Sequence, residues 1–109
     1  MTARVVLLGA TGFTGRLTAE ATVRAGLAPV LAGRSVDALV ALTGDLAGLG
    51  PMDAPPSWAV ADASDPASVR ALVHDPADVL VSTVGPFTRL GRAAVDAAVD
   101  QGCAYVDST

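Results

Sequence analysis

Five short apolar runs alternate along this chain with segments of helical spacing, and this alternation restricts the fold more than any other feature of the sequence. Gly, Pro and Asp residues separate the segments. Continuous apolar strands joined by helical crossovers form a parallel sheet that is buried on both faces, and right-handed crossovers favour a doubly wound topology. We therefore predict an α/β fold of about five parallel strands in three layers.

The segments follow one another in strict β-α order. The expected strands are Arg4–Leu8, Pro29–Ala32, Trp58–Ala61, Val79–Val84 and Cys103–Val106, and the expected helices are Thr14–Ala25, Val36–Leu46, Pro66–His74 and Leu90–Gln101. In the first helix Leu17, Ala21 and Ala25 recur at the spacing of a core-facing stripe, and Glu20 can pair with Arg24 on the outer face.

The ends of the helices carry recognisable signals. Ser35 stands where an N-cap is expected, Asp65 caps a helix that Pro66 opens, and Gly26 and Gly102 follow helices where a left-handed cap is common. These signals set the helix boundaries independently of the apolar pattern.

Composition narrows the class of protein. With 109 residues the chain forms at most one domain, and a hydrophobic content of 51% against 17% charged residues excludes disorder. A net charge of −4 argues against a nucleic-acid partner, which requires a basic surface. Aromatic residues are scarce, so we expect a core of Val, Leu and Ala that also includes Trp58.

Cysteine usage and the N-terminal sequence suggest a location. Cys103 is the single cysteine and cannot form an internal disulfide, and no charged leader precedes an apolar run. A cytoplasmic protein is the expectation. Lys, Asn and Ile, whose codons are AT-rich, are absent, which indicates a GC-rich and so bacterial genome.

A glycine-rich loop follows the first expected strand and leads directly into the first helix. Its sequence is Gly9-Ala10-Thr11-Gly12-Phe13-Thr14-Gly15. In a Rossmann-like fold the first glycine allows the tight turn, the second lets a pyrophosphate approach the backbone, and the third lets helix and strand pack closely. The helix N-terminus supplies amides and a positive dipole end, and the two Thr hydroxyls can add donors. We therefore predict a dinucleotide site; the alternative is that the glycines only turn the chain.

The end of the second strand indicates which dinucleotide binds. NAD-binding domains usually carry an acidic residue there, whereas this chain has Gly33-Arg34-Ser35. The guanidinium of Arg34 suits a 2′-phosphate, and the hydroxyl of Ser35 can assist it. This favours NADP (NADPH), unless Arg34 is simply a solvated surface charge.

Two further strand ends are expected to line the site, because ligands of open α/β sheets bind beyond the carboxyl ends of the strands. Asp62 and Ala63 follow the third strand, where Asp62 is either an acceptor for the adenine amine or an ordinary loop acid. Thr83, Val84, Gly85 and Pro86 end the fourth strand beside the expected ribose and nicotinamide positions. Phe87 either walls the nicotinamide ring or packs in the core.

The remaining reactive residues suggest no chemistry of their own. His74 ends a helix and is expected to be structural, and Cys103 has no neighbouring base, so it is expected to act as a small core residue. The Asp residues are scattered without metal-ligand spacing. We predict no catalytic residue and no metal site in these residues.

The glycine loop, Ala32-Gly33-Arg34-Ser35, Thr83-Val84-Gly85-Pro86-Phe87 and the ending Tyr105-Val106-Asp107-Ser108-Thr109 together resemble the NADP-binding domain of the saccharopine dehydrogenase-like family, most closely its bacterial trans-acting enoyl reductase branch. The resemblance implies that the glycine loop, the Gly-Arg pair and the Val-Gly-Pro turn form the cofactor site. One departure is Leu90-Gly91, where the family commonly has Tyr-Gly. The family pattern continues with a catalytic and dimerisation domain, so residues 1–109 are expected to be the N-terminal part of a longer chain.

These observations support two functions of different kinds. The first is the NADP-binding domain of an oxidoreductase that transfers hydride between NADPH and a small or lipid-like substrate held by another domain. The second is a regulatory or redox-sensing domain that binds NAD(P) without catalysis, because a fold does not fix a function. A methyltransferase with a related loop would carry an acid in place of Arg34.

Whichever function applies, the fifth strand is expected to leave an apolar sheet edge that invites self-association into a homo-oligomer.

Overall fold

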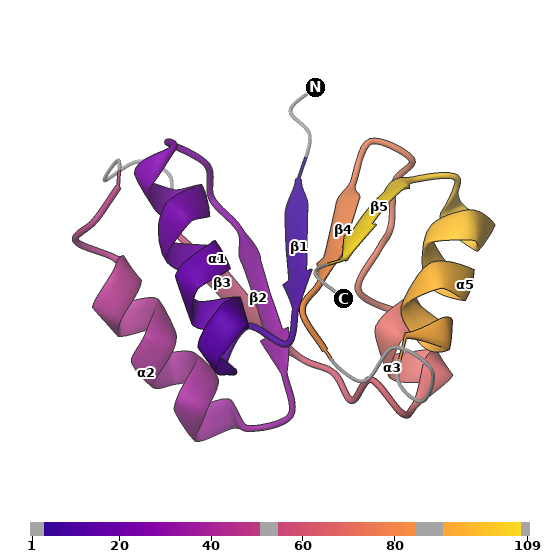
Figure 1. Ribbon diagram of the computed structural model, residues 1–109, viewed down its shortest axis with the longest axis horizontal. Coiled ribbons are helices and arrows are strands. Elements are labelled where there is room, and N and C mark those ends of the chain that lie inside the picture. The colour runs from indigo at the N-terminus through magenta and orange to yellow at the C-terminus, as the bar shows by residue number, and fades with distance from the viewer. Residues whose placement is uncertain (1–3, 51–54, 85–90, 108–109) are drawn as a thin grey trace.

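The computed structural model describes residues 4–50, 55–84 and 91–107, and these fold into one parallel sheet with helices on both faces (Figure 1). The strands are β1 (Val5–Leu8), β2 (Val30–Gly33), β3 (Ser57–Val60), β4 (Val79–Ser82) and β5 (Ala104–Asp107), in the order β3-β2-β1-β4-β5. The helices are α1 (Phe13–Arg24), α2 (Val36–Leu46), α3 (Pro66–Arg70) and α5 (Arg92–Gln101). The predicted doubly wound, Rossmann-like fold of five strands is confirmed.

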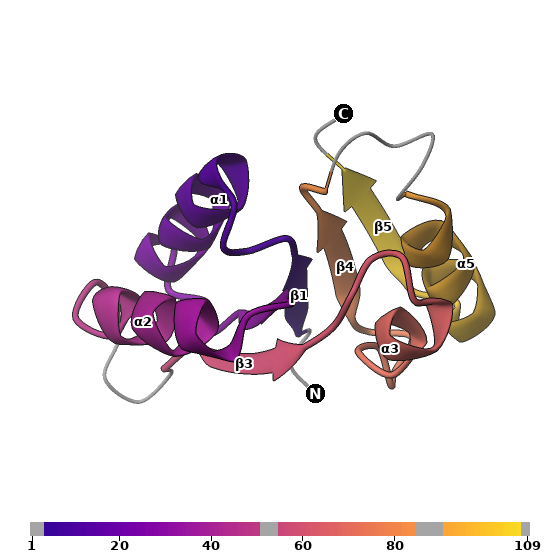
Figure 2. The same cartoon turned by 90° about the horizontal axis from the view of Figure 1, so that it is seen from below.

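The sheet separates two apolar clusters, as the view in Figure 2 shows, with α1 and α2 on one face and α3 and α5 on the other. Alternate residues of one strand enter different clusters: Val6 and Leu8 lie on the α3/α5 face and Leu7 on the α1/α2 face. The predicted core of Val, Leu and Ala is present in both clusters. The outer strands are covered less well, and Val106 in β5 is 53% exposed.

Helix α1 is rotated relative to the sequence prediction. Its buried residues are Gly15, Ala19 and Val23, whereas Leu17 is 54% exposed and Ala21 and Ala25 also face solvent. The cause is Gly15: a Cβ at this position would lie 1.9 Å from the carbonyl oxygen of Gly9, so only a glycine can face the loop there. This contact fixes the rotation of the helix, so Phe13 and Leu17 point outward. The predicted outer pair of Glu20 and Arg24 is confirmed, with 3.1 Å between its charged atoms.

The prediction that Trp58 lies in the core is wrong. Its side chain is 40% exposed because β3 is an outer strand of the sheet, with β2 on one side only. Composition and apolar pattern are the same for a central and an outer strand of this length, so the sequence did not separate the two cases.

Helix α3 ends at Arg70 and not near His74. The next residues form tighter turns, with Leu72 N–H donating to Val69 and Val73 N–H to Arg70. The turns bring His74 beside Asp78, which is 4% exposed. Asp78 accepts from the His74 N–H at 2.9 Å and from both Nε and an Nη of Arg4, at 3.3 and 2.9 Å. This ion pair joins the start of β1 to the turn before β4.

The helix-start signals are confirmed at two sites. The Ser35 hydroxyl accepts from Ala38 N–H at 3.2 Å, and Asp65 accepts from Ala67 N–H at 3.2 Å with Pro66 in the first turn. Gly102 has the left-handed conformation expected of a C-cap. Strand β4 ends two residues before the predicted Val84, and Leu90 lies outside the described residues. In the described ranges no helix combines the length and hydropathy that a bilayer crossing requires.

Candidate functional site

The glycine loop connects β1 to α1 and makes close contacts with the two residues that follow β4. Gly9 has φ +85°, and a Cβ there would lie 2.8 Å from Thr83 Oγ1 and 2.8 Å from a methyl group of Val84. Gly9 N–H donates to the carbonyl of Ala32 at 2.9 Å, and Gly12 N–H donates to Gly9 at 3.2 Å. The loop is therefore held tightly against β2 and β4 before α1 begins.

Gly12 differs from the other two glycines of the motif. Its φ of −76° is accessible to any residue, and a Cβ would have Gly9 O as its nearest neighbour at 3.6 Å. As the N-cap of α1, Gly12 offers no capping side chain, and the first turn contains no acid. The first-turn amides of this twelve-residue helix thus face outward with the positive end of the dipole, which suits a phosphate group.

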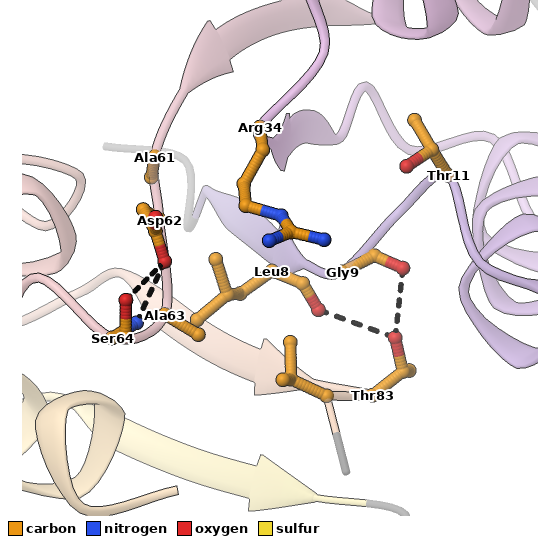
Figure 3. A pocket seen from close by; sticks show the side chains of 10 residues that line it. Leu8, Gly9, Thr11, Arg34, Ala61, Asp62, Ala63, Ser64 and Thr83 are labelled. Atoms are coloured by element: carbon orange, nitrogen blue, oxygen red, sulfur yellow. Dashed lines mark hydrogen bonds between the residues drawn. The ribbon is translucent and has the colours of Figure 1, made fainter. Parts of the chain in front are cut away.

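A cavity of about 460 Å³ lies at the carboxyl ends of β1 to β4 (Figure 3). The residues around it are Leu8, Gly9, Thr11, Arg34, Ala61, Asp62, Ala63, Ser64, Thr83 and Val84. The cavity is within the range usual for cofactor sites. It lies where β1 has β2 on one side and β4 on the other, which is the switch point at which open α/β sheets bind ligands.

Thr83 positions the glycine loop and is not a free donor. Its hydroxyl can donate to the carbonyls of Leu8 and Gly9, at 3.2 and 3.1 Å, and its N–H donates to Leu8 at 3.0 Å. Figure 3 shows the two hydroxyl contacts as dashed lines. The residue thereby ties the end of β4 to the turn after β1.

Arg34 and Asp62 reach the cavity from just beyond the ends of the neighbouring strands β2 and β3 (Figure 3). Asp62 Oδ1 accepts from the hydroxyl and the N–H of Ser64, at 2.7 and 2.9 Å. These hydrogen bonds lower the pKa of Asp62 against an opposing effect of desolvation, and the positive charge of Arg34 makes a lesser contribution in the same direction as the hydrogen bonds. Asp62 is therefore an ionised acceptor, with Oδ2 available to a ligand, and Arg34 supplies a positive charge in the same cavity.

The cavity brings together half of the fourteen predicted site residues: Gly9, Thr11, Arg34, Asp62, Ala63, Thr83 and Val84. Gly12, Phe13 and Thr14 are exposed at the start of α1, outside its lining, and Phe13 is 84% exposed. Ala10 is fully buried and its N–H donates to Ala32, so it supports the loop from beneath. Ser35 caps α2. Gly85 and Pro86, like Phe87, lie outside the described residues.

Three lining residues were not among the predicted ones. Leu8 and Ala61 border the cavity because they stand at the carboxyl ends of β1 and β3, and their position in the strands was the signal available. Ser64 is part of the lining because its hydroxyl and its N–H both donate to Asp62. Such a local turn is common when Asp precedes Ser by two residues, so the pattern could have indicated it.

Three other titratable side chains, those of Cys103, Tyr105 and His74, are not part of the lining of this cavity. Burial raises the pKa of the Cys103 thiol, which packs against the α3/α5 cluster. Burial and then the nearby carboxylate of Asp107 raise the pKa of Tyr105. His74 contacts the carbonyl of Ala71 at 2.7 Å. Within the described part of the chain no cluster of His, Cys, Asp and Glu could hold a metal ion.

Known proteins share this fold and much of this sequence. Residues 5–109 match the family model described as the saccharopine dehydrogenase NADP-binding domain. Trans-acting enoyl reductases of Mycobacterium tuberculosis and Mycobacterium ulcerans are 42% and 41% identical to the chain, with 96% of the chain aligned. The chain spans 25% of the length of each of these relatives.

A solved structure supports the fold independently of close sequence similarity. A short-chain oxidoreductase of Pseudomonas aeruginosa in complex with NADPH superposes with a TM-score of 0.74 at 23% identity, over 96% of this chain and 52% of that one. This likeness concerns the fold alone. The family assignment rests on the match over residues 5–109: the chain belongs to the saccharopine dehydrogenase NADP-binding domain family.

Proposed function

We propose that this chain binds NADP(H) at the carboxyl edge of its sheet, as the cofactor-binding part of an oxidoreductase. The observation that carries the proposal is the joint position of Arg34 and the glycine loop around one cavity. The uncapped N-terminus of α1 fits a pyrophosphate, and so does Gly12, where a Cβ would meet no atom closer than Gly9 O at 3.6 Å. The guanidinium of Arg34 fits the 2′-phosphate that distinguishes NADP from NAD.

Other residues of the site complete the proposed binding mode. Ser35 accepts from the backbone of α2, so its hydroxyl proton can be donated to the 2′-phosphate beside Arg34. Asp62 can accept from the exocyclic amine of adenine through Oδ2. Val84, with Gly85 and Pro86 after it, is proposed to border the ribose and nicotinamide. Thr83 acts through the loop that it holds.

The cofactor supplies the redox chemistry in this proposal, and the protein supplies binding and orientation. The relatives are enoyl reductases by name, and the chain corresponds to a quarter of their length. We propose that hydride passes between NADPH and a small or lipid-like substrate held by residues of the longer protein. We expect the chain by itself to bind the cofactor without turnover. The cytoplasmic location expected from the sequence stays a prediction.

Calorimetric titration with NADPH and NADH tests the proposal. NADPH should bind more tightly than NADH. Loss of the charge-assisted contacts in Arg34→Ala should weaken NADPH binding by about 10- to 100-fold and change NADH binding little. Arg24→Ala is the matched control, because it removes the same charge from the outer surface of α1. Equal affinity for the two cofactors would remove the role of Arg34, and a folded chain that binds neither would contradict the proposal as a whole.

A further inference from the structure

Strand β3 combines a sheet edge with an exposed apolar surface. Among the described strands it is outermost on its side of the sheet, and its sequence Ser57-Trp58-Ala59-Val60 contains no charge, proline or glycine. Proteins usually protect such edges with Lys, Pro or a bulge. Trp58 and Val60 are 40% and 50% exposed, so both the edge and the side chains beside it face solvent.

The backbone of β3 presents its polar groups in alternation. Ser57 N–H donates to Pro29 and Ala61 N–H donates to Gly33, so the odd-numbered residues direct their hydrogen-bonding groups toward β2. Because successive residues of a strand alternate in this respect, Trp58 and Val60 direct theirs away from the sheet. Two N–H donors and two C=O acceptors are thereby available to another strand.

Helix α2 extends the apolar surface beyond the strand. Trp58 and Val60 pair in register with Leu31 and Gly33 and so share the face of the sheet that α2 covers. On α2 the buried residues face the sheet, and Asp45, which pairs with Arg16, faces α1. Val36 and Val40 lie on the side opposite Asp45, away from α1. Val36 and Val40 are 45% and 50% exposed. We call Val36, Val40, Trp58 and Val60 the β3–α2 surface.

We propose that the β3–α2 surface binds a second copy of this chain, with the two β3 strands antiparallel about a two-fold axis at Ala59. In this register Trp58 lies opposite Val60 of the second copy, and the two residues exchange both backbone hydrogen bonds. The same pair places an aromatic side chain against a β-branched one, a favourable cross-strand combination. The two sheets join into one of ten strands.

The positions of the helices agree with this arrangement. Helix α2 contacts both β2 and β3, so it lies over this pair of strands. With neighbouring strands about 4.8 Å apart, the two-fold axis places the α2 helices about 10 Å from each other, the usual separation of packed helices. Val36 and Val40 then fill the seam between them. The four residues of the surface are uncharged, so a two-fold contact brings no like charges together at its centre.

The β5 edge is the alternative that the sequence suggested, and it fits a two-fold contact less well. Val106 is as exposed as Val60, at 53% and 50%, but the strand ends in Asp107. No described helix extends an apolar surface beside β5 on the face where Val106 lies, since α1 and α2 lie over the opposite half of that face (Figure 2).

Sedimentation velocity over a range of concentrations tests the proposal with two matched variants. The chain should form a dimer, and Val60→Lys should raise the dimer dissociation constant by tenfold or more, because a two-fold contact brings the introduced charges together. Val106→Lys places the same charge on the other edge and should leave the dimer unchanged. Circular dichroism should show that both variants fold. A chain that stays monomeric at high concentration, or a dimer weakened only by Val106→Lys, would overturn the proposal.

A cysteine on the axis tests the register and does not depend on the lysine variant. Ala59 of each copy would form a non-hydrogen-bonded pair, with Cα atoms about 4.5 Å apart and within the range of a disulfide. Oxidised Ala59→Cys should therefore run as a reducible dimer in electrophoresis. Ser57→Cys, on the same face of the same strand, should not cross-link, because its two copies lie four residues out of register. Cross-linking of Ser57→Cys but not Ala59→Cys would rule out the proposed register, and no cross-link in Ala59→Cys would rule out the pairing.

Discussion

The three glycines of the loop after β1 have different roles. Gly9 has a positive φ and close contacts with Thr83 and Val84, and Gly15 lies against the carbonyl of Gly9. The fold itself requires both of these residues. Gly12 has an ordinary conformation, and its Cβ would make only an ordinary contact of 3.6 Å with Gly9 O, so the fold does not require a glycine there; in the proposed binding mode the pyrophosphate does.

Alanine substitutions should separate these roles. Gly12→Ala should change the free energy of unfolding by less than about 1 kcal/mol and lower the affinity for NADPH by about tenfold or more, since a methyl group occupies the space of the pyrophosphate. Gly15→Ala should destabilise the fold by about 3 kcal/mol or more, because the backbone of the loop must move. Urea denaturation and cofactor titration measure the two effects. A Gly12→Ala protein with unchanged affinity would show that the loop does not approach the ligand there.

Asp78 should make the stability of the fold depend on pH. The hydrogen bonds from Arg4 lower its pKa in the folded state, and the N–H groups of His74 and Asp75 add to this effect against desolvation. A lowered pKa stabilises the fold above the unfolded-state pKa of about 4, and this contribution is lost as the pH falls through the lower folded-state value. Asp78→Asn should therefore cost about 1–3 kcal/mol at neutral pH and less in acid.

Urea denaturation between neutral and acidic pH measures this effect, and Asp45→Asn provides the control. Asp45 pairs with Arg16 on the surface, where both side chains are more than half exposed, so its loss should cost less than about 1 kcal/mol. If Asp78→Asn and Asp45→Asn had the same small effect at neutral pH, the Arg4–Asp78 pair would not stabilise the fold as described.

At the scale of elements, the hydroxyl of Thr83, the residue after β4, helps to hold the glycine loop. Thr83 can donate to the carbonyls of Leu8 and Gly9, which are 75 and 74 residues away in sequence. Thr83→Val keeps the shape and removes the donor, so we expect a loss of about 1–2 kcal/mol in stability and a weaker affinity for NADPH. Thr83→Ser retains the hydroxyl and should preserve the affinity. Equal cofactor affinity in all three proteins would show that the loop needs no such tie.

The elements themselves show where sequence reasoning succeeds and where it fails. Helix α2 was predicted with its observed bounds, Val36–Leu46, because a serine cap and an apolar stripe mark it together. Helix α1 was found, but its buried side was assigned wrongly, since the close contact of Gly15 with Gly9 joins residues that no periodicity relates. Trp58 was misplaced for a similar reason: whether a strand is central or outermost depends on partners distant in sequence.

For the candidate site, the sequence located the segments that meet at the cavity, because a parallel sheet brings its carboxyl ends to one edge. It could not tell which residues of each segment face that cavity. Gly9 and Thr11 border it, whereas Ala10 between them is buried beneath. Nor could it show that the Thr83 hydroxyl is engaged with the backbone, since that hydrogen bond exists only after β1 and β4 have paired.

At the scale of the whole molecule, the proposed cofactor should stabilise the fold. The cavity takes residues from four strand ends, so a ligand there binds the folded chain and not the unfolded one. At a concentration about 100 times its dissociation constant, NADPH should add about 2.7 kcal/mol and raise the melting temperature by on the order of 10 °C. A thermal melt with and without NADPH measures this. Arg34→Ala should show a smaller rise at the same NADPH concentration, and an unchanged melting temperature with NADPH would contradict binding at the sheet edge.

The strand order has a consequence for how such a domain can diversify. Residues up to β3 lie on one side of β1 and those from α3 onward lie on the other, and the segment from Ala61 to Asp65 joins these halves across the carboxyl edge of the sheet (Figure 2). The same segment carries Asp62 and Ser64. Insertions or deletions there would alter ligand recognition and the spacing of the halves together. Changes of specificity are therefore easier to reach by exchanging side chains in this segment than by changing its length.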